Sequence, residues 1–139
     1  MLSRVLVPMD GSEMSEQALE YALDAYPGVD VTVLVVAGEP SSMWGQATGL
    51  ALADDLSVAA DEHAQPVFDR ATDIADEYDV EVDTIVDVGH PVRAILNRAG
   101  DYDTIVVGAH GGSVADRLFV GNVAEKIFRR SPVPVVVVR

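Results

Sequence analysis

Short apolar segments recur along the chain and predict its strands. Val5–Pro8, Thr104–Val107 and Val135–Val138 are brief runs rich in β-branched residues, and Val31–Ala37 is an almost unbroken apolar run of the kind that is buried on both faces of a parallel sheet. The segment Val80–Val88 instead alternates apolar with acidic positions. This alternation predicts a half-exposed strand near an edge of the sheet.

Helical spacing fills the intervals between these segments. Ser12 or Ser15 can cap a helix that Pro27–Gly28 stops, and Pro91 opens another that ends at Gly100. The residues Gly121–Arg130 form the last helical segment.

The longest helical pattern runs from Asp54 to Tyr78. Its expected buried stripe recurs at steps of four and three and consists of Leu56, Ala60, His63, Val67, Ala71, Ile74 and Tyr78. Pro66 lies inside this pattern and cannot donate a backbone hydrogen bond. We therefore expect a kink there, or two abutting helices.

The order of these elements predicts the fold class. Five strands alternate with four helices, which is typical of a doubly wound parallel sheet with helices on both faces, a flavodoxin-like or Rossmann-like α/β sandwich. A length of 139 residues suits one domain, so residues 1–139 are expected to form a single unit.

The charge and the composition of the chain exclude several kinds of partner and of binding site. Nine basic residues stand against 23 acidic ones, which gives a net charge of −14, and Lys126 is the single lysine. Such a surface repels nucleic acid and anionic membranes, so neither is expected as a partner. The chain has no cysteine, which excludes disulfides and thiolate metal sites. We expect a soluble cytoplasmic protein whose acidic surface suits concentrated salt, where charge repulsion is screened.

The candidate ligand site lies in the loops that follow the strands. Ligands of open α/β sheets bind at the carboxyl ends of the strands, here Pro8–Ser12, Val36–Pro40 and Gly108–Ser113. The first loop lacks the Gly-x-Gly-x-x-Gly pattern, and no Gly-x4-Gly-Lys motif is present. Glycines after the fourth strand and a helix start at Gly121 can hold an anion through backbone N–H groups, although such a loop can also be a simple turn. Asn122 can equally be a helix cap with a capping-box partner at Glu125.

Taken together, three motifs resemble the universal stress protein family. They are VPMDGS at residues 7–12, Gly-x2-Gly-x9-Gly at residues 108–121, and SPVPVVVVR at residues 131–139. The resemblance implies a flavodoxin-like fold, a homodimer and, in one branch of the family, a pocket for ATP or AMP. That branch has serine or threonine after the last glycine, where this chain has Asn122.

The resemblance also implies roles for particular residues. Gly108 and Gly111 would line the ribose and phosphates, Gly121 would meet the phosphates, and Asp10 would lie beside the ribose. Val36 would offer backbone groups to the adenine. The full set expected to bind the nucleotide is Pro8, Met9, Asp10, Val36, Gly108, Gly111, Gly112, Gly121, Asn122 and Val123. Mg²⁺ is expected to accompany the nucleotide, because an acidic chain offers few side-chain cations to a polyanion. His63, His90 and His110 are scattered, so no metal site made of protein side chains is expected.

Three hypotheses for the function are compatible with the sequence. The first is a dimeric regulator or protectant that binds an adenine nucleotide, the second is a nucleotide-free dimeric scaffold, and the third is a slow ATP-hydrolysing enzyme. No catalytic residue is predicted, because no serine with a histidine and an acid can be assembled from the loops. The homodimer is expected to form through the apolar last strand, with Val135, Val136, Val137 and Val138 at the interface.

Overall fold

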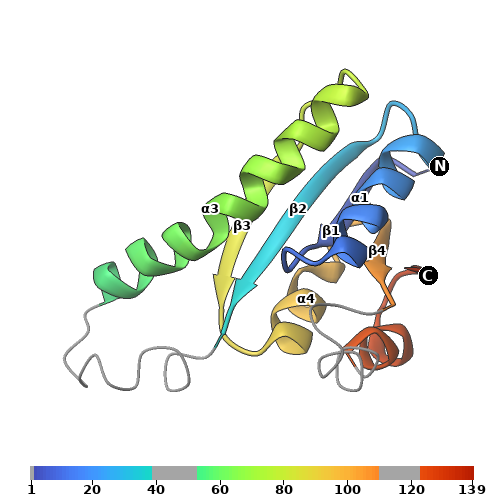
Figure 1. Cartoon of the computed structure of the whole chain (residues 1–139). Helices are drawn as coiled ribbons and strands as arrows, with labels where there is room; N and C mark the ends of the chain where they lie inside the picture. Colours follow the sequence, from blue (N-terminus) through green and yellow to red (C-terminus); the bar gives the residue numbers. More distant parts are fainter. Residues whose placement is uncertain (1, 39–52, 110–122) are drawn as a thin grey trace.

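The structure is a computed structural model and describes residues 2–38, 53–109 and 123–139. It confirms the predicted parallel sheet of five strands, in the order β3-β2-β1-β4-β5 (Figure 1). The strands are β1 (Arg4–Pro8), β2 (Asp30–Ala37), β3 (Asp83–Val88), β4 (Thr104–Gly108) and β5 (Val135–Val138). The chain adds β2 and β3 on one side of β1 and then β4 and β5 on the other, so the direction of winding reverses between β1 and β4.

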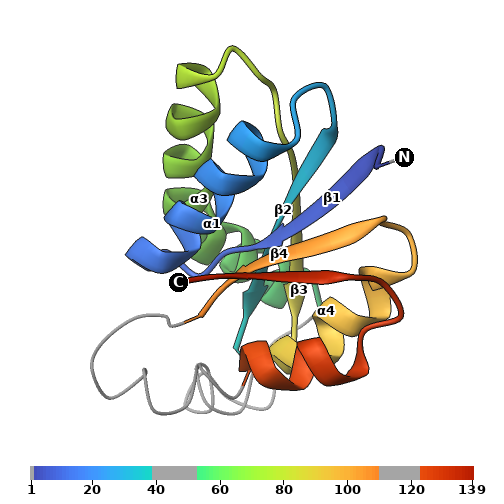
Figure 2. The same ribbon diagram turned by 90° about the vertical axis from the view of Figure 1, so that its right-hand side faces the viewer.

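Helices cover both faces of the sheet (Figure 2). The labelled helices are α1 (Glu13–Ala25), α3 (Ala53–Glu77) and α4 (Pro91–Ala99), and residues 123–130 form a further helix. Helices α1 and α3 lie on one face, and α4 and the 123–130 helix lie on the other. Within the described ranges, no helix has an apolar stretch that could cross a membrane.

Successive side chains of a strand point to opposite faces of the sheet, so the core consists of two clusters, one on each face. Val5 and Val7 of β1 point into the cluster under α1 and α3, whereas Leu6 points into the cluster under α4 and the 123–130 helix. Ile95 of α4 and Ile127 complete that second cluster. All five side chains are at least 97% buried, so β1 is packed from both faces.

Helix α3 differs from the expected pattern in two ways. It is one continuous helix with Pro66 in its interior, so the prediction of two abutting helices was wrong. His63, which was expected on the buried stripe, is exposed, and the neighbouring Ala64 is fully buried instead.

Strand β3 is shorter than predicted. It begins at Asp83, although the apolar and acidic alternation starts at Val80. Val80 and Val82 pack against the cluster under α1 and α3 before the strand joins β2. β3 forms one edge of the sheet and is half-exposed, as expected.

Asp103 ties the start of β4 to the start of β1. Its Oδ2 accepts hydrogen bonds from the backbone N–H and hydroxyl of Ser3, at 2.8 and 2.9 Å, and from the Arg4 N–H at 2.9 Å. The Asp103 N–H donates to the Arg4 carbonyl at 2.8 Å. These donors stabilise the charged carboxylate and hold the pKa of Asp103 below its ordinary value. The largest effect comes from the backbone N–H of Ser3.

We expect Asp103→Ala to lower the melting temperature at pH 7, because it removes three hydrogen bonds to a charged acceptor. The folded-state pKa is lowered, so this stabilisation is complete above the unfolded-state value of about 3.9 and disappears as the pH falls through the folded-state pKa. Melting curves of both proteins between pH 7 and pH 2.5 test this. Asp101→Ala, which changes a nearby exposed carboxylate, is the control. Equal melting temperatures of parent and Asp103→Ala at pH 7 would contradict the assignment.

Candidate functional site

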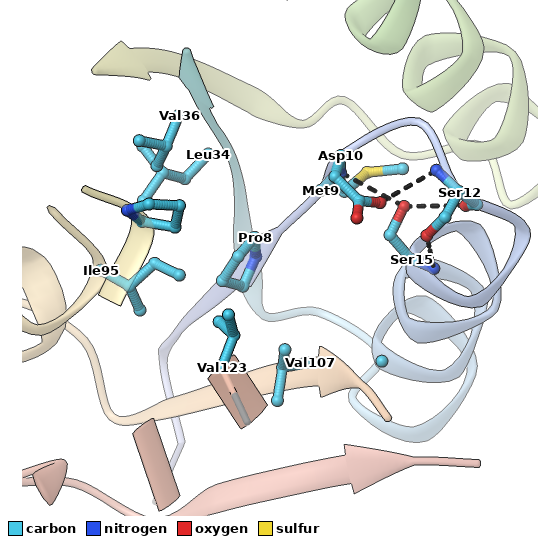
Figure 3. Close-up of a pocket in the computed structure, with 12 residues that line it drawn as sticks. Pro8, Met9, Asp10, Ser12, Ser15, Leu34, Val36, Ile95, Val107 and Val123 are labelled. Carbon is cyan, nitrogen blue, oxygen red and sulfur yellow. Dashed lines mark hydrogen bonds between the residues drawn. The ribbon is translucent and has the colours of Figure 1, made fainter. Parts of the chain in front are cut away.

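A pocket of about 170 Å³ opens at the carboxyl ends of β1, β2 and β4 (Figure 3). This is the edge at which the winding of the sheet reverses, and ligands of open α/β sheets bind at such a point. The described residues that line it are Pro8, Met9, Asp10, Ser12, Ser15, Leu34, Val36, Pro91, Ile95, Val107, Gly108 and Val123. All three strands named in the sequence prediction therefore contribute to one cavity.

One side of the pocket is apolar. Pro8, Leu34 and Val107 come from three adjacent strands and lie on the sheet face that α4 covers, and Ile95 of α4 lies across from them (Figure 3). Val36 follows Leu34 by two residues, so both side chains leave β2 on this face. Walls of this kind suit a flat, weakly polar group such as a nucleobase.

The other side of the pocket is polar and belongs to the turn between β1 and α1. Asp10 Oδ1 accepts a hydrogen bond from the Ser12 N–H at 2.9 Å, and Gly11 between them has φ +83°, which favours glycine. Ser12 caps α1 by accepting the Ser15 N–H at 3.2 Å. The Ser15 hydroxyl donates to the Ser12 carbonyl at 2.8 Å.

These bonds leave Asp10 available to a ligand. The carboxylate is exposed, and its Oδ2 accepts no hydrogen bond from residues 2–38, 53–109 or 123–139. A carboxylate only accepts hydrogen bonds, so Asp10 can hold hydroxyl donors at the rim of the pocket.

Gly108 allows the pocket to form at the end of β4. A β-carbon built on Gly108 would lie 2.8 Å from the carbonyl oxygen of Met14 and 2.9 Å from its carbonyl carbon. The backbone of α1 therefore passes directly over this glycine. The close approach places the start of α1, with its cap Ser12 and with Ser15 in its first turn, beside the carboxyl end of β4.

An ion pair fixes α4 beside the pocket. The guanidinium of Arg98 donates two hydrogen bonds to Asp87 of β3, at 2.5 and 2.7 Å. The hydrogen bond to Asp87 raises the pKa of Arg98. Asp87 is paired in register with Val36, so the bond joins α4 to the strand pair that forms a pocket wall.

The structure brings six of the ten predicted site residues to this pocket. They are Pro8, Met9, Asp10, Val36, Gly108 and Val123. Met9 is 4% exposed and packs in the core under α1, with its N–H bonded to the Leu34 carbonyl at 2.8 Å. The other four, Gly111, Gly112, Gly121 and Asn122, lie outside the described residues.

Several lining residues were not predicted from the sequence. Leu34 and Val107 could have been found by counting back along the strands, from Val36 by two positions and from Gly108 by one. Pro91 and Ile95 carry no such signal, because their place depends on how α4 packs against the sheet.

The whole chain matches a family of known proteins. The sequence profile of the Universal stress protein family matches residues 1–139. Universal stress protein YxiE of Bacillus subtilis is 30% identical over 148 residues, which span 100% of each chain.

Two solved structures share the fold. Protein MJ0577 of Methanocaldococcus jannaschii has a TM-score of 0.79 at 26% identity, over 99% of this chain and 96% of that chain. A universal stress protein crystallised in complex with cAMP has a TM-score of 0.70 at 25% identity, over 99% and 97% of the two chains. With its full length matched by the family profile and its fold shared with these relatives, the chain belongs to the universal stress protein family.

Proposed function

We propose that this stress protein binds an adenine nucleotide, ATP or AMP, in the pocket at the carboxyl ends of β1, β2 and β4. The observation that carries the proposal is the placement of the Asp10 carboxylate at the rim of an apolar cavity. A ribose offers neighbouring hydroxyl donors to such an acceptor, while the base lies against Leu34, Val36 and Ile95. The relative solved in complex with cAMP, also an adenine nucleotide, supports this ligand class.

The phosphates are proposed to extend toward the Gly-x2-Gly-x9-Gly segment, which Gly108 begins. Gly111, Gly112, Gly121 and Asn122 would bind them through backbone N–H groups and the Asn122 amide. Val123 would lie at the start of the 123–130 helix, where free N–H groups attract anions. We therefore also propose that this chain belongs to the branch of the universal stress protein family that binds ATP.

Mg²⁺ would bind mainly through the phosphates. Among the described residues there is no group of three histidine, aspartate or glutamate side chains placed to hold a metal ion. A phosphate-bound Mg²⁺ that keeps several waters fits such a site.

The pocket favours binding over catalysis. Phosphoryl transfer requires cations that stabilise the transferring charge. None of the pocket residues in the described ranges is lysine or arginine, and Asp10 is their one acid. We therefore propose a nucleotide-dependent regulator or protectant in the cytoplasm, whose acidic surface also suits concentrated salt.

Nucleotide release and titration test the proposal. The purified protein is denatured, and the supernatant is analysed by mass spectrometry and absorbance for ATP or AMP. The nucleotide-free protein is then titrated with Mg·ATP and with AMP by calorimetry, and ATP turnover is followed at steady state. No released nucleotide and no heat with either ligand would favour the nucleotide-free scaffold, and steady turnover would favour the enzyme.

We further propose that the protein is a homodimer through β5. The carbonyl of Pro134 accepts a hydrogen bond from the N–H of Ile105 in β4 at 3.0 Å, and that of Val138 accepts one from Ala109, just after β4, at 2.8 Å. Because backbone direction alternates along a strand, the groups of Val135 and Val137 face the open edge, while those of Val136 face β4. No strand in the described parts of the chain pairs with this edge, so a second copy can do so.

Val137→Lys is expected to convert the dimer to a monomer. The side chain of Val137 is 38% exposed, so lysine places a charge at the proposed interface with little disturbance of the chain's own core. Val58→Lys makes the same change at a valine of α3 that is 56% exposed and should leave the dimer intact. Sedimentation velocity measures the mass of both variants. A dimeric Val137→Lys would place the interface elsewhere.

A further inference from the structure

A second cavity lies between α4 and the 123–130 helix. Val92 and Leu96 are its apolar lining residues, and its polar side chains come from α4 and the 123–130 helix: His90, Arg93, Asn97, Lys126 and Arg130. Its volume is about 350 Å³. We call it the basic groove. It shares no described lining residue with the nucleotide pocket.

The groove collects positive charge on a strongly acidic protein. The chain has nine basic residues against 23 acidic ones, and three of the nine line this groove. No aspartate or glutamate is among its described lining residues. Lys126 and Arg130 are four residues apart on the 123–130 helix, so they lie one above the other on the same side. Arg93 approaches the groove from α4.

The groove cations are not used in ion pairs with described residues. The three salt bridges of those residues engage Arg70, Arg98 and Arg129. Arg129 bonds to Glu125 at 2.8 Å, and it neighbours Arg130 in the sequence but does not line the groove. Arg93, Lys126 and Arg130 therefore keep their hydrogen-bond donors for a ligand, within the described residues.

The start of α4 adds backbone donors at the same groove. His90 is the residue before the helix and makes no side-chain capping bond, and the first turn contains no acid. The N–H groups of Val92 and Arg93 have no partner within the helix. By contrast, α1 is capped by Ser12 and carries two acids in its first turn. The first turn of α4 thus adds positive potential beside the three cations.

We propose that the basic groove binds a small, multiply charged phosphate anion. Cations from two helices and free backbone N–H groups match the several oxygens of such an ion. The net charge of −14 repels long polyanions that extend beyond the groove, which favours a compact ligand over nucleic acid. The site is independent of the nucleotide pocket, and its test does not require that ATP binds.

Calorimetric titration with inorganic pyrophosphate at 50 mM KCl tests the groove. The wild-type chain is expected to bind one pyrophosphate. Arg93→Gln and Arg130→Gln should each weaken binding about tenfold, because each removes a charged donor while keeping a polar side chain. Arg129→Gln is the matched control on the same helix and should change the affinity less than twofold. Affinity should fall as KCl is raised to 300 mM.

Four results would overturn the proposal. The first is no pyrophosphate binding by the wild-type chain, and the second is undiminished binding by both Arg93→Gln and Arg130→Gln. The third is loss of binding in Gly121→Val with the groove variants unaffected, which would place pyrophosphate in the nucleotide pocket. A change of mass in Arg93→Gln without ligand, measured by sedimentation, would assign the groove to contact with a second copy and would also overturn it. Circular-dichroism melts confirm that each variant is folded.

Discussion

Gly108→Ala is expected to destabilise the protein by about 2–3 kcal/mol, because the added methyl group overlaps the backbone of α1. The new β-carbon would lie 2.8 Å from the carbonyl oxygen of Met14 and 2.9 Å from the adjoining carbon. Both atoms belong to the main chain and cannot rotate away, so α1 must move off β4. Denaturant unfolding followed by circular dichroism gives the change in the free energy of unfolding.

Gly100→Ala provides the matched control. Gly100 ends α4 at φ −64°, which alanine adopts readily, and a β-carbon there meets no atom within 4 Å. This variant should be neutral or stabilised by about 0.4–1 kcal/mol, since alanine restricts the unfolded chain. If Gly108→Ala were as stable as Gly100→Ala, the close approach of α1 to β4 would be wrong.

Val36→Trp is expected to weaken nucleotide binding on the order of 100-fold, or about 2.7 kcal/mol. The half-buried Val36 lines the proposed base-binding wall at the end of β2. An indole there occupies space that the adenine would need. Calorimetry with Mg·ATP measures the affinity, and a thermal melt shows whether the variant is folded.

Val88→Trp makes the same change at the end of the neighbouring strand. Val88 is 40% exposed and does not line the pocket. The affinity of Val88→Trp for Mg·ATP should therefore match that of the parent protein. Parent-like binding by a folded Val36→Trp would show that the nucleotide lies elsewhere. Equal loss in both variants would indicate a general disturbance of the β2–β3 pair.

The pattern of apolar residues was sufficient to predict the five strands of the sheet, but not where each strand begins. The apolar runs of β1, β2, β4 and β5 identified those strands, because a parallel sheet covered on both faces demands unbroken apolar segments. The start of β3 could not be predicted in the same way. Val80 and Val82 are apolar because they pack under α1 and α3, and backbone pairing with β2 begins only at Asp83, opposite Thr32.

The buried positions of α3 could be predicted only in part from the spacing of apolar residues. The predicted stripe correctly included Ala60, Ala71 and Ile74, which are buried, but it also included the exposed His63. It left out two further alanines that are fully covered, Ala64 and Ala75. Small residues can face the core wherever a helix packs closely, and alanine is also common on exposed helix surfaces. Periodicity alone therefore does not distinguish His63 from Ala64.

The location of the candidate site could be predicted better than its composition. The carboxyl ends of three strands are brought together by topology, so Pro8, Val36 and Gly108 followed from the order of elements. The contact of Gly108 with Met14 joins residues 94 positions apart, since 108 minus 14 is 94, and no short motif encodes it. In the basic groove, likewise, Arg93 is distant in sequence from Lys126 and Arg130, and the packing of α4 brings it beside them.

The position of β1 between β2 and β4 has a consequence for synthesis on the ribosome. Val5 pairs with Val31 on one side but with Thr104 on the other. At 5–20 residues per second, about 4–15 s separate the emergence of these two partners of β1. During that interval the apolar residues Val5–Pro8 of β1 keep one row of backbone groups unpaired, which makes the nascent chain a substrate for holding chaperones until β4 arrives.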